Sequence, residues 1–171
     1  MNAKILLTGI PKSGKTTLLH KLINDTRAKI GFITVEVKEN DERIGFKIVT
    51  STGDEAILAS TKINTPIRVS RYFVNIENLE RVLPKIETFN KDDVLYIDEI
   101  GEMELYSDKF KGLVRKYLDS TNTFIATVSK IYDDDLIRQI KNEEDIEIIE
   151  INPGNREMVY ENLKERLLIT S

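Results

Sequence analysis

Residue types on which whole classes of protein depend are absent or nearly absent from this 171-residue sequence. It has no cysteine, which excludes disulfides, iron–sulfur clusters, thiolate zinc sites and cysteine nucleophiles. It has one histidine, which excludes a metal site built from several histidines. A Ser-His-Asp triad would have to use that histidine, His20, which falls in a predicted helix. We expect His20 to face solvent or to pack against its neighbours.

A basic excess and long apolar runs are missing as well. The 25 Lys and Arg residues are outnumbered by 29 Asp and Glu residues, and the net charge is −4. Proteins that coat DNA or RNA usually carry a basic excess, so the charge does not support a nucleic-acid partner. No run approaches the ~20 apolar residues of a membrane span, and no signal-peptide pattern opens the chain. We therefore expect a cytoplasmic protein with no membrane partner.

Short apolar runs alternate with segments of helical periodicity, and the length is that of one domain, residues 1–171. Strands are expected at 4–8, 94–97, 123–128 and 146–151. Helices are expected at 15–26, at 75–89 with a kink or break at Pro84, at 110–118, at 133–141 and at 155–168. Strands separated by helices predict an α/β fold with a mainly parallel sheet and helices on both faces.

One region departs from that alternation. Three strand-like segments at 30–37, 43–50 and 55–60 follow the first helix, separated only by turn-like residues. Such close spacing without helices predicts an antiparallel meander within residues 30–60. We expect it to be an insertion or an edge extension of the sheet. A loop containing Pro66 then leads to residues 71–74.

The first strand runs into a segment that matches G-x-x-x-x-G-K-[ST]. Its residues are Gly9, Ile10, Pro11, Lys12, Ser13, Gly14, Lys15 and Thr16, called the phosphate loop below. Because the segment follows a strand and opens a helix, its backbone N–H groups and the helix N-terminus can face phosphate oxygens. In such a loop Lys15 reaches the β- and γ-phosphates, and the Thr16 hydroxyl binds Mg²⁺. The sequence therefore predicts a nucleotide site.

A second motif lies where the apolar strand at 94–97 runs into Asp98 and Glu99. In phosphate-loop enzymes an Asp at a strand end supplies a carboxylate that positions Mg²⁺, and we assign that role to Asp98. A carboxylate just beyond the strand can hold a water in line with the γ-phosphate, so Glu99 is our candidate general base or water-orienting residue. The alternative is a solvated acidic pair in a loop.

Residues 90–93 read N-K-x-D, the string that GTPases use to recognise guanine. In GTPases this string follows the D-x-x-G segment, whereas here it precedes residues 98–101, which carry that pattern. It would enter the sheet at the wrong end of a strand, because ligands bind outside the carboxyl ends. We interpret residues 90–93 as a polar turn, which disfavours a switch GTPase but leaves GTP open as a substrate.

With both motifs placed, the chain resembles the THEP nucleoside-triphosphatase family nearly end to end. The resemblance rests on residues 9–17, 31–34, 43–49, 58–60, 71–75, 98–105 and 155–156. It implies a three-layer, RecA-like P-loop NTPase fold and Mg²⁺-dependent hydrolysis of the γ-phosphate of ATP, GTP and other nucleoside triphosphates, with low base specificity. The resemblance also implies that Thr17 belongs to the nucleotide-binding residues. It implies the same for the family's acidic block, which consists of Asp98, Glu99, Ile100 and Gly101.

The chain departs from the family pattern at a few positions. Residues 11–14 read Pro-Lys-Ser-Gly where Pro-Gly-Val-Gly is usual, so Lys12 adds a charge near the phosphates. Glu102 stands where Lys is common, and Ser129 and Lys130 replace a frequent His-Arg pair. None of these departures touches Lys15, Thr16, Asp98 or Glu99.

A positive charge beyond Lys15 would help to stabilise the transition state, and Arg71 and Arg156 are the candidates. For each arginine the alternative is a surface or structural ion pair. Asn155 precedes Arg156 and is a candidate contact for base or ribose, with plain helix capping as the alternative.

Three activities remain open from the sequence. The leading interpretation is a triphosphatase. The second is a small-molecule or nucleotide kinase, which would need a second substrate pocket and usually an arginine-rich lid. No clustered lid arginines are evident, although Arg68, Arg71 and Arg81 could gather in space. The third is a nucleotide-operated binding module with slow hydrolysis, in which the meander binds a protein partner whose identity the sequence does not reveal.

Overall fold

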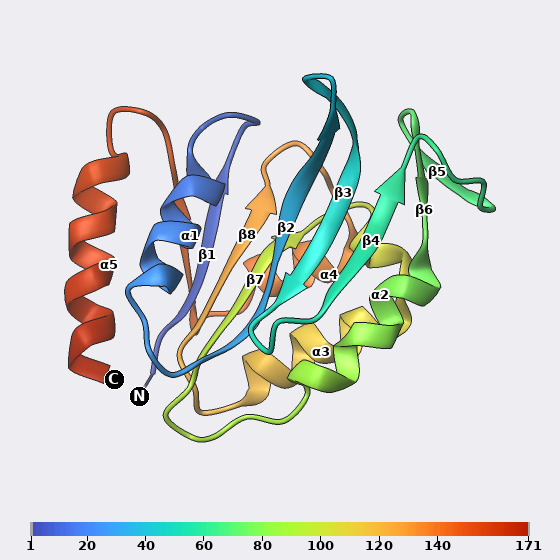
Figure 1. Cartoon of the computed structure of the whole chain (residues 1–171). Helices are drawn as coiled ribbons and strands as arrows, with labels where there is room; N and C mark the ends of the chain where they lie inside the picture. Colours follow the sequence, from blue (N-terminus) through green and yellow to red (C-terminus); the bar gives the residue numbers. More distant parts are fainter. Residues whose placement is uncertain (1, 171) are drawn as a thin grey trace.

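The computed structural model describes residues 2–170, without the side chains of 168–170, so the two end residues of the expected 1–171 domain lie outside the described part. Its nine strands form a single sheet in the order β5-β6-β4-β3-β2-β7-β8-β1-β9 (Figure 1). The strands are β1 (Lys4–Gly9), β2 (Lys29–Glu39), β3 (Glu42–Thr50), β4 (Glu55–Ser60), β5 (Ile67–Val69), β6 (Tyr72–Val74), β7 (Val94–Ile100), β8 (Phe124–Ser129) and β9 (Ile146–Glu150).

One half of the sheet is parallel, as the alternation of strands and helices predicts. β2 pairs with β7, β7 with β8, β8 with β1, and β1 with β9, all in parallel. β8 therefore lies between β1, which leads into the phosphate loop, and β7, which carries the acidic residues. Gly9 is the last residue of β1, and Asp98 and Glu99 are near the end of β7, so the parallel arrangement brings both motifs to the carboxyl ends of the strands.

The other half of the sheet is antiparallel. β2, β3 and β4 form the expected meander, and it extends the same sheet, because β2 also pairs in parallel with β7. The expectation of a loop before residues 71–74 was incomplete: β5 and β6 form an antiparallel hairpin whose second strand pairs with β4. Each of these strands has three residues, too few for hydrophobic periodicity to reveal.

Helices cover both faces of the sheet and bury two separate cores (Figure 1). The helices are α1 (Lys15–Asn24), α2 (Ile76–Val82), α3 (Asp108–Asp119), α4 (Asp135–Lys141) and α5 (Arg156–Thr170). On one face α1 and α5 pack against β1, β7 and β8 through residues such as Leu19 and Leu163. On the other face α2, α3 and α4 contribute Leu79, Val114 and Ile137 to the larger core.

Local signals explain where several of these helices begin and end. Asn75 caps α2, since its side chain accepts a hydrogen bond from Asn78 N at 2.9 Å. α2 ends at Val82, and Pro84 lies in the 3₁₀ turn Leu83–Ile86 that follows, which confirms the break expected at this proline. Ser107 caps α3 in the same way as Asn75 caps α2.

Candidate active site

The phosphate loop joins β1 to α1 in a tight turn. Ser13 N donates to Ile10 O at 3.1 Å, and Gly14 stands immediately before the first helical residue. Gly14 has a φ of +98°, a left-handed conformation that a residue with a Cβ adopts only with strain. The turn therefore positions the N-terminus of α1 next to the loop, where its free N–H groups can meet an anion.

Two buried polar side chains in this loop have few or no hydrogen-bond partners. Lys15 is 7% exposed, and its Nζ donates to Gly9 O at 3.2 Å across the loop. The Ser13 hydroxyl is buried and has no hydrogen-bond partner among the described residues. Because buried polar groups are normally paired, the unpaired hydroxyl and the buried ammonium fit an anionic ligand held in the loop.

Asp98 is the point at which the two motifs meet. It is 3% exposed, and its Oδ1 accepts hydrogen bonds from Thr127 Oγ1 at 2.7 Å and from Thr16 Oγ1 at 3.3 Å. Thr16 belongs to the phosphate loop and Thr127 to β8, so one carboxylate joins the loop to the two neighbouring strands. Thr16 and Asp98, the two candidate Mg²⁺ ligands, are therefore in direct contact.

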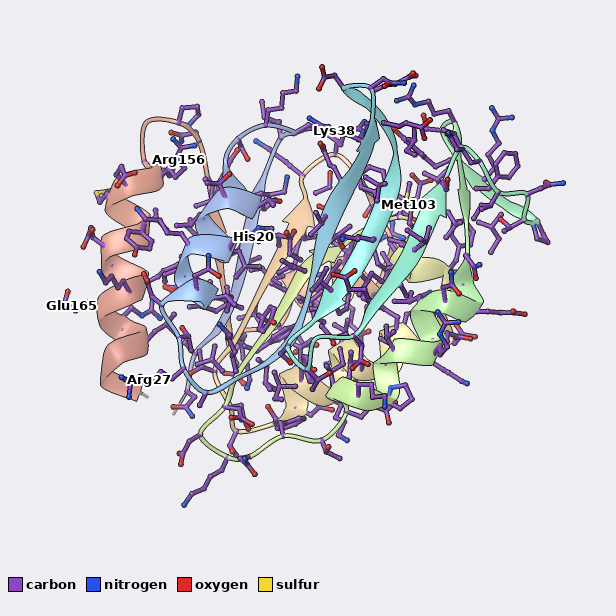
Figure 2. All side chains as sticks on the ribbon, in the orientation of Figure 1. His20, Arg27, Lys38, Met103, Arg156 and Glu165 are labelled. Carbon is purple, nitrogen blue, oxygen red and sulfur yellow. The ribbon has the colours of Figure 1, made fainter. Side chains whose placement is uncertain are left out.

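His20 packs against a neighbour, which is one of its two expected placements, but that neighbour is a residue of the site. Its Nε2 lies 2.7 Å from Asp98 Oδ2, and the side chain is 30% exposed. The reason is helical geometry: His20 is four residues beyond Thr16 on α1, and residues at this spacing share one face of a helix. Figure 2 marks His20 on α1.

Beyond Asp98 the strand β7 leaves its regular pairing with β8. Ile97 pairs with Ala126, and the next pair is Ile100 with Val128, so the residues between them interrupt the register. Here Glu99 is half-buried. A Cβ on Gly101 would lie 2.8 Å from a carboxylate oxygen of Glu99 and 2.9 Å from one of Glu104. The two carboxyl groups therefore flank Gly101.

Both of these carboxyl groups hold their protons more tightly than usual. Burial raises the pKa of Glu99, and the charge of Asp98 adds to this, while the charge of Lys15 opposes it. Burial and the nearby charge of Glu99 raise the pKa of Glu104 to about 8. Carboxyl groups with raised pKa values in a polar site are typical of acid–base chemistry.

The donor set at this site fits Mg²⁺. Among the described residues no cluster of three or more His, Asp or Glu side chains could hold a metal by itself. Mg²⁺ does not need such a cluster, because it usually takes one or two carboxylates together with phosphate and water oxygens. The hydroxyl of Thr16 and the buried carboxylate of Asp98 supply hard oxygen ligands of this kind.

The two candidate arginines lie in different places. A Cβ on Gly14 would come within 2.7 Å of both Cδ and Nη1 of Arg156, so this side chain lies against the phosphate loop. Figure 2 marks Arg156 at the start of α5. Arg71 instead lies in the hairpin between β5 and β6, where its guanidinium donates to Tyr72 Oη, to Arg43 O and to Glu42. These bonds hold Arg71 on the antiparallel half of the sheet.

The remaining predicted residues are placed as follows. Ile10, Pro11, Lys12 and Thr17 are exposed around the loop, and Ile10 is 58% exposed. The side chain of Ile100 is 1% exposed and belongs to the core. The Asn155 side chain is engaged by the turn before α5, since it accepts from Asn152 N at 2.9 Å and donates to Glu150 O at 2.8 Å.

The polar turn at residues 90–93 is confirmed. Asn90 N donates to Asp93 Oδ2 at 2.8 Å, and the Asn122 side chain donates to the carbonyls of both residues. The turn precedes β7 and therefore lies at the amino end of the strand that carries Asp98 at its other end. It is held by its own contacts rather than directed at the phosphate loop.

Sequence reasoning missed three residues of this site. His20 had a usable signal, because its spacing from Thr16 places both on one helical face. Thr127 lies in an apolar strand and reaches Asp98 only because β8 is the neighbour of β7. Glu104 lies in the short 3₁₀ helix η2 (Glu104–Tyr106), and its burial beside Glu99 depends on a fold-back that has no periodic signal.

Comparisons with known proteins show the family to which this chain belongs. A family model described as NTPase matches residues 4–164. The nucleoside-triphosphatase THEP1 of Thermotoga maritima is 45% identical over 155 residues, which cover 90% of this chain and 88% of that protein. The THEP1 protein of Methanocaldococcus jannaschii is 35% identical over 172 residues, which cover 96% of this chain and 97% of its own.

Two solved structures share the fold. The crystal structure of THEP1 from the hyperthermophile Aquifex aeolicus has a TM-score of 0.81 and 34% sequence identity, and the match covers 96% of this chain and 98% of that one. The solution structure of a human cancer-related nucleoside triphosphatase also has a TM-score of 0.81, at 28% identity, and the match covers 96% and 97% of the two chains. In the described part of this chain, no helix has the length and apolar character needed to span a membrane.

Proposed function

Because this chain belongs to the THEP1 nucleoside-triphosphatase family and is a nucleoside-triphosphatase, we propose that it hydrolyses the γ-phosphate of ATP, GTP and other nucleoside triphosphates in a Mg²⁺-dependent reaction with low base specificity. The products are the nucleoside diphosphate and inorganic phosphate. The observation that carries this proposal is the 3.3 Å contact between Thr16 Oγ1 and Asp98 Oδ1, because it joins the phosphate loop to the acidic strand end.

The phosphate loop binds and orients the triphosphate. Its backbone N–H groups and the N-terminus of α1 face the phosphate oxygens, and Lys15 neutralises charge on the β- and γ-phosphates. In this proposal the Lys15 ammonium exchanges its present contact with Gly9 O for the phosphate oxygens. Positioning and charge neutralisation of this kind supply most of the catalysis in phosphoryl transfer.

Thr16 and Asp98 would hold Mg²⁺ next to the loop. A bound Mg²⁺ supplies charge stabilisation for the phosphate oxygens as the bond breaks. Thr127 and His20 contact the carboxylate of Asp98 and fix its orientation. A ligand carboxylate that is itself hydrogen-bonded in this way keeps its geometry with little loss of entropy on binding.

Glu99 orients the attacking water and accepts its proton. The water oxygen forms a bond to the γ-phosphorus, the bond from that phosphorus to the β,γ-bridging oxygen breaks, and the nucleoside diphosphate leaves. The raised pKa of Glu99 supports this role, because a more basic carboxylate is a better proton acceptor near neutral pH. The charge of Glu99 in turn raises the pKa of Glu104, which also lies next to Gly101.

Arg156 is the arginine that we assign to the charge developing on the phosphates. Its guanidinium lies against Gly14 in the phosphate loop, within reach of a bound polyphosphate. Arg71 is left out of the catalytic set, because its three hydrogen bonds engage it on the hairpin and the neighbouring strand β3. The low base specificity is supported by Asn155, whose amide is already satisfied by the backbone of residues 150 and 152.

The direct test is phosphate release by the purified protein with ATP, GTP, CTP and UTP, each with and without Mg²⁺. We expect similar rates with the four nucleotides and loss of activity when Mg²⁺ is removed. Rates that differ by orders of magnitude would contradict low base specificity. Unchanged activity after removal of Mg²⁺ would contradict the roles of Thr16 and Asp98 as its ligands.

The variant Glu99→Gln tests the general base. The amide keeps the shape of the side chain but cannot accept a proton, so we expect kcat to fall by about 10²–10⁴-fold while the nucleotide Kd stays unchanged. The matched control is Glu144→Gln, which makes the same change at an exposed position far from the motifs in sequence. Near-normal kcat in Glu99→Gln, measured by phosphate release, would refute the assignment.

A further inference from the structure

A cavity of about 530 Å³ adjoins the proposed catalytic residues, and hydrolysis alone does not account for it. This volume is in the range of small-molecule sites. Thr16, Asp98 and Glu99 line one part of it. The antiparallel half of the sheet supplies a second group of lining residues: Thr34, Glu36, Phe46, Leu58 and Val69. The end of β8 and the segments after β7 and β8 supply the third group: Glu102, Met103, Glu104, Ser129, Ile131 and Tyr132.

The cavity is distinct from the space that the nucleotide needs. Of the phosphate loop only Thr16 lines it, and neither Asn155 nor Arg156 is among its lining residues. Most of the cavity is therefore lined by residues outside the phosphate loop, whereas Arg156 lies against Gly14 within the loop. A second molecule bound in the cavity would lie next to the γ-phosphate and beside Glu99.

The lining has the character of a site for a molecule with an apolar body. Phe46, Leu58 and Val69 line it from the antiparallel strands, and Met103 and Ile131 from the loops. Ile131 is 71% exposed, although an isoleucine normally gains by burial, which a ligand would provide. The Thr34 hydroxyl is buried and has no hydrogen-bond partner in the described part of the chain.

The charge of the lining favours a cation. Five of the lining residues carry carboxyl groups, of which Asp98 would be paired with Mg²⁺ and Glu104 holds its proton near neutral pH. The negative charge of the lining therefore rests on the other three, and none of the described lining residues is a lysine, arginine or histidine. Glu36 already pairs with Arg43 at 3.1 Å and with Lys38 at 3.8 Å, whereas Glu102 is exposed and has no ion pair with any described residue. A triphosphate bound beside the cavity would add further negative charge, so an anion would be repelled and a cation attracted.

We propose that this cavity binds a second small molecule, an amphipathic cation with an apolar body, next to the γ-phosphate of the bound nucleotide. The proposal rests on the proposed function for the position of the γ-phosphate, but the cavity and its lining do not depend on it. The antiparallel meander and hairpin then have a role, because they supply one part of a site that the parallel half alone would lack.

Three probes that share a phenol ring and differ at one end test the charge preference: tyramine, which is a cation, tyrosol, which is neutral, and 4-hydroxyphenylacetate, which is an anion. Their affinities are measured by titration with and without the nonhydrolysable ATP analogue AMP-PNP and Mg²⁺. We expect tyramine to bind most tightly, tyrosol less tightly and 4-hydroxyphenylacetate least tightly. Tyramine should also bind more tightly when AMP-PNP is present. Equal affinities, or preference for the anion, would overturn the proposal.

The chain offers a direct way to locate the bound probe. It has three methionines, and with ¹³C-labelled methyl groups they give three NMR signals that Met103→Leu and Met158→Leu assign. Met103 lines the cavity, whereas Met158 lies on α5 and is 70% exposed. Tyramine should shift the Met103 signal and leave the Met158 signal in place. A shift of Met158 alone, or of neither signal at saturation, would refute binding in the cavity.

A matched pair of variants separates this proposal from the proposed function. Ile131→Lys and Met158→Lys make the same kind of change at side chains of almost equal exposure, 71% and 70%, so neither threatens the fold. Ile131→Lys should weaken tyramine binding about fivefold or more by charge repulsion, whereas Met158→Lys should not. Equal effects would contradict the proposal. Failure of AMP-PNP to bind the unaltered protein would instead contradict the proposed function.

Discussion

At the scale of single residues, the site depends on carboxyl groups in different surroundings. Asp98 is buried but surrounded by donors, namely Thr16, Thr127 and His20. Glu104 is also buried, at 3% exposure, but it lies beside the charge of Glu99. The first arrangement suits a carboxylate that holds a cation, and the second favours a carboxyl group that keeps its proton.

The pKa of about 8 for Glu104 predicts how stability depends on pH. The usual pKa of glutamic acid is 4.5, so in the unfolded chain Glu104 loses its proton above pH 4.5. In the folded protein Glu104 keeps its proton up to about pH 8. The folded state thus binds more protons in this window, so the free energy of unfolding falls as pH rises through it. Glutamine has no proton to lose, so Glu104→Gln should remove this pH dependence. The free energy of unfolding should rise by an amount on the order of 3 kcal/mol at pH 8 and change little at pH 4.5.

Urea unfolding of Glu104→Gln at pH 4.5 and pH 8 measures this difference. Glu144→Gln is the control, because Glu144 is exposed and its change should have the same small effect at both pH values. A gain for Glu104→Gln that is equal at the two pH values would show that the carboxyl group is not protonated in the folded protein.

At the scale of elements, the close pairing of strands carries the site. β2 and β7 approach so closely that a Cβ on Gly31 would lie 1.9 Å from Tyr96 O. By contrast, Gly112 on α3 is exposed, and a Cβ there meets nothing within 4 Å. The same substitution should therefore have opposite effects in the two elements.

Gly31→Ala should lower the free energy of unfolding by about 2–4 kcal/mol, because the new methyl group forces β2 away from β7. Gly112→Ala should raise it by about 0.5–1 kcal/mol, because alanine favours the helix. Urea unfolding measures both changes. If Gly31→Ala yields no folded protein, that result also supports the expected destabilisation. Equal effects of the two substitutions would contradict the close approach of these strands.

At the scale of the whole molecule, the two cores lie on opposite faces of one sheet, and the phosphate loop joins β1 to α1 above one of them (Figure 1). A ligand that binds this loop contacts only the folded state. It should therefore stabilise the whole domain by mass action, by about 2.7 kcal/mol at a hundred times its Kd.

AMP-PNP with Mg²⁺ should thus raise Tm by roughly 5–11 °C at that concentration, since 1 kcal/mol shifts Tm by about 2–4 °C for a chain of this size. Chelation of Mg²⁺ should reduce the shift. In Lys15→Ala the shift at the same concentration should be much smaller, because the charge that binds the phosphates is gone. A full shift in Lys15→Ala, measured by thermal unfolding, would contradict the role of the phosphate loop.

Much of the fold and site was predictable because it depends on local patterns. The β1–α1 turn, the meander and the break at Pro84 all follow from residues close in sequence. The strand expected at 94–97 is also present, but it runs on through Asp98 and Glu99 to Ile100. Short segments without periodicity were not predictable, as the three-residue strands β5 and β6 and the 3₁₀ helix at Glu104 show.

The sequence by itself determined where the phosphate loop and the acidic residues stand relative to their strands and helix, because both motifs are contiguous. Only the tertiary structure decided which distant residues join them. Thr127 and His20 contact Asp98, Glu104 lies beside Glu99, and Arg156 rather than Arg71 lies against the loop. Residues from both halves of the sheet line one cavity. These contacts depend on strand order and helix packing, which bring together residues that no spacing along the chain connects.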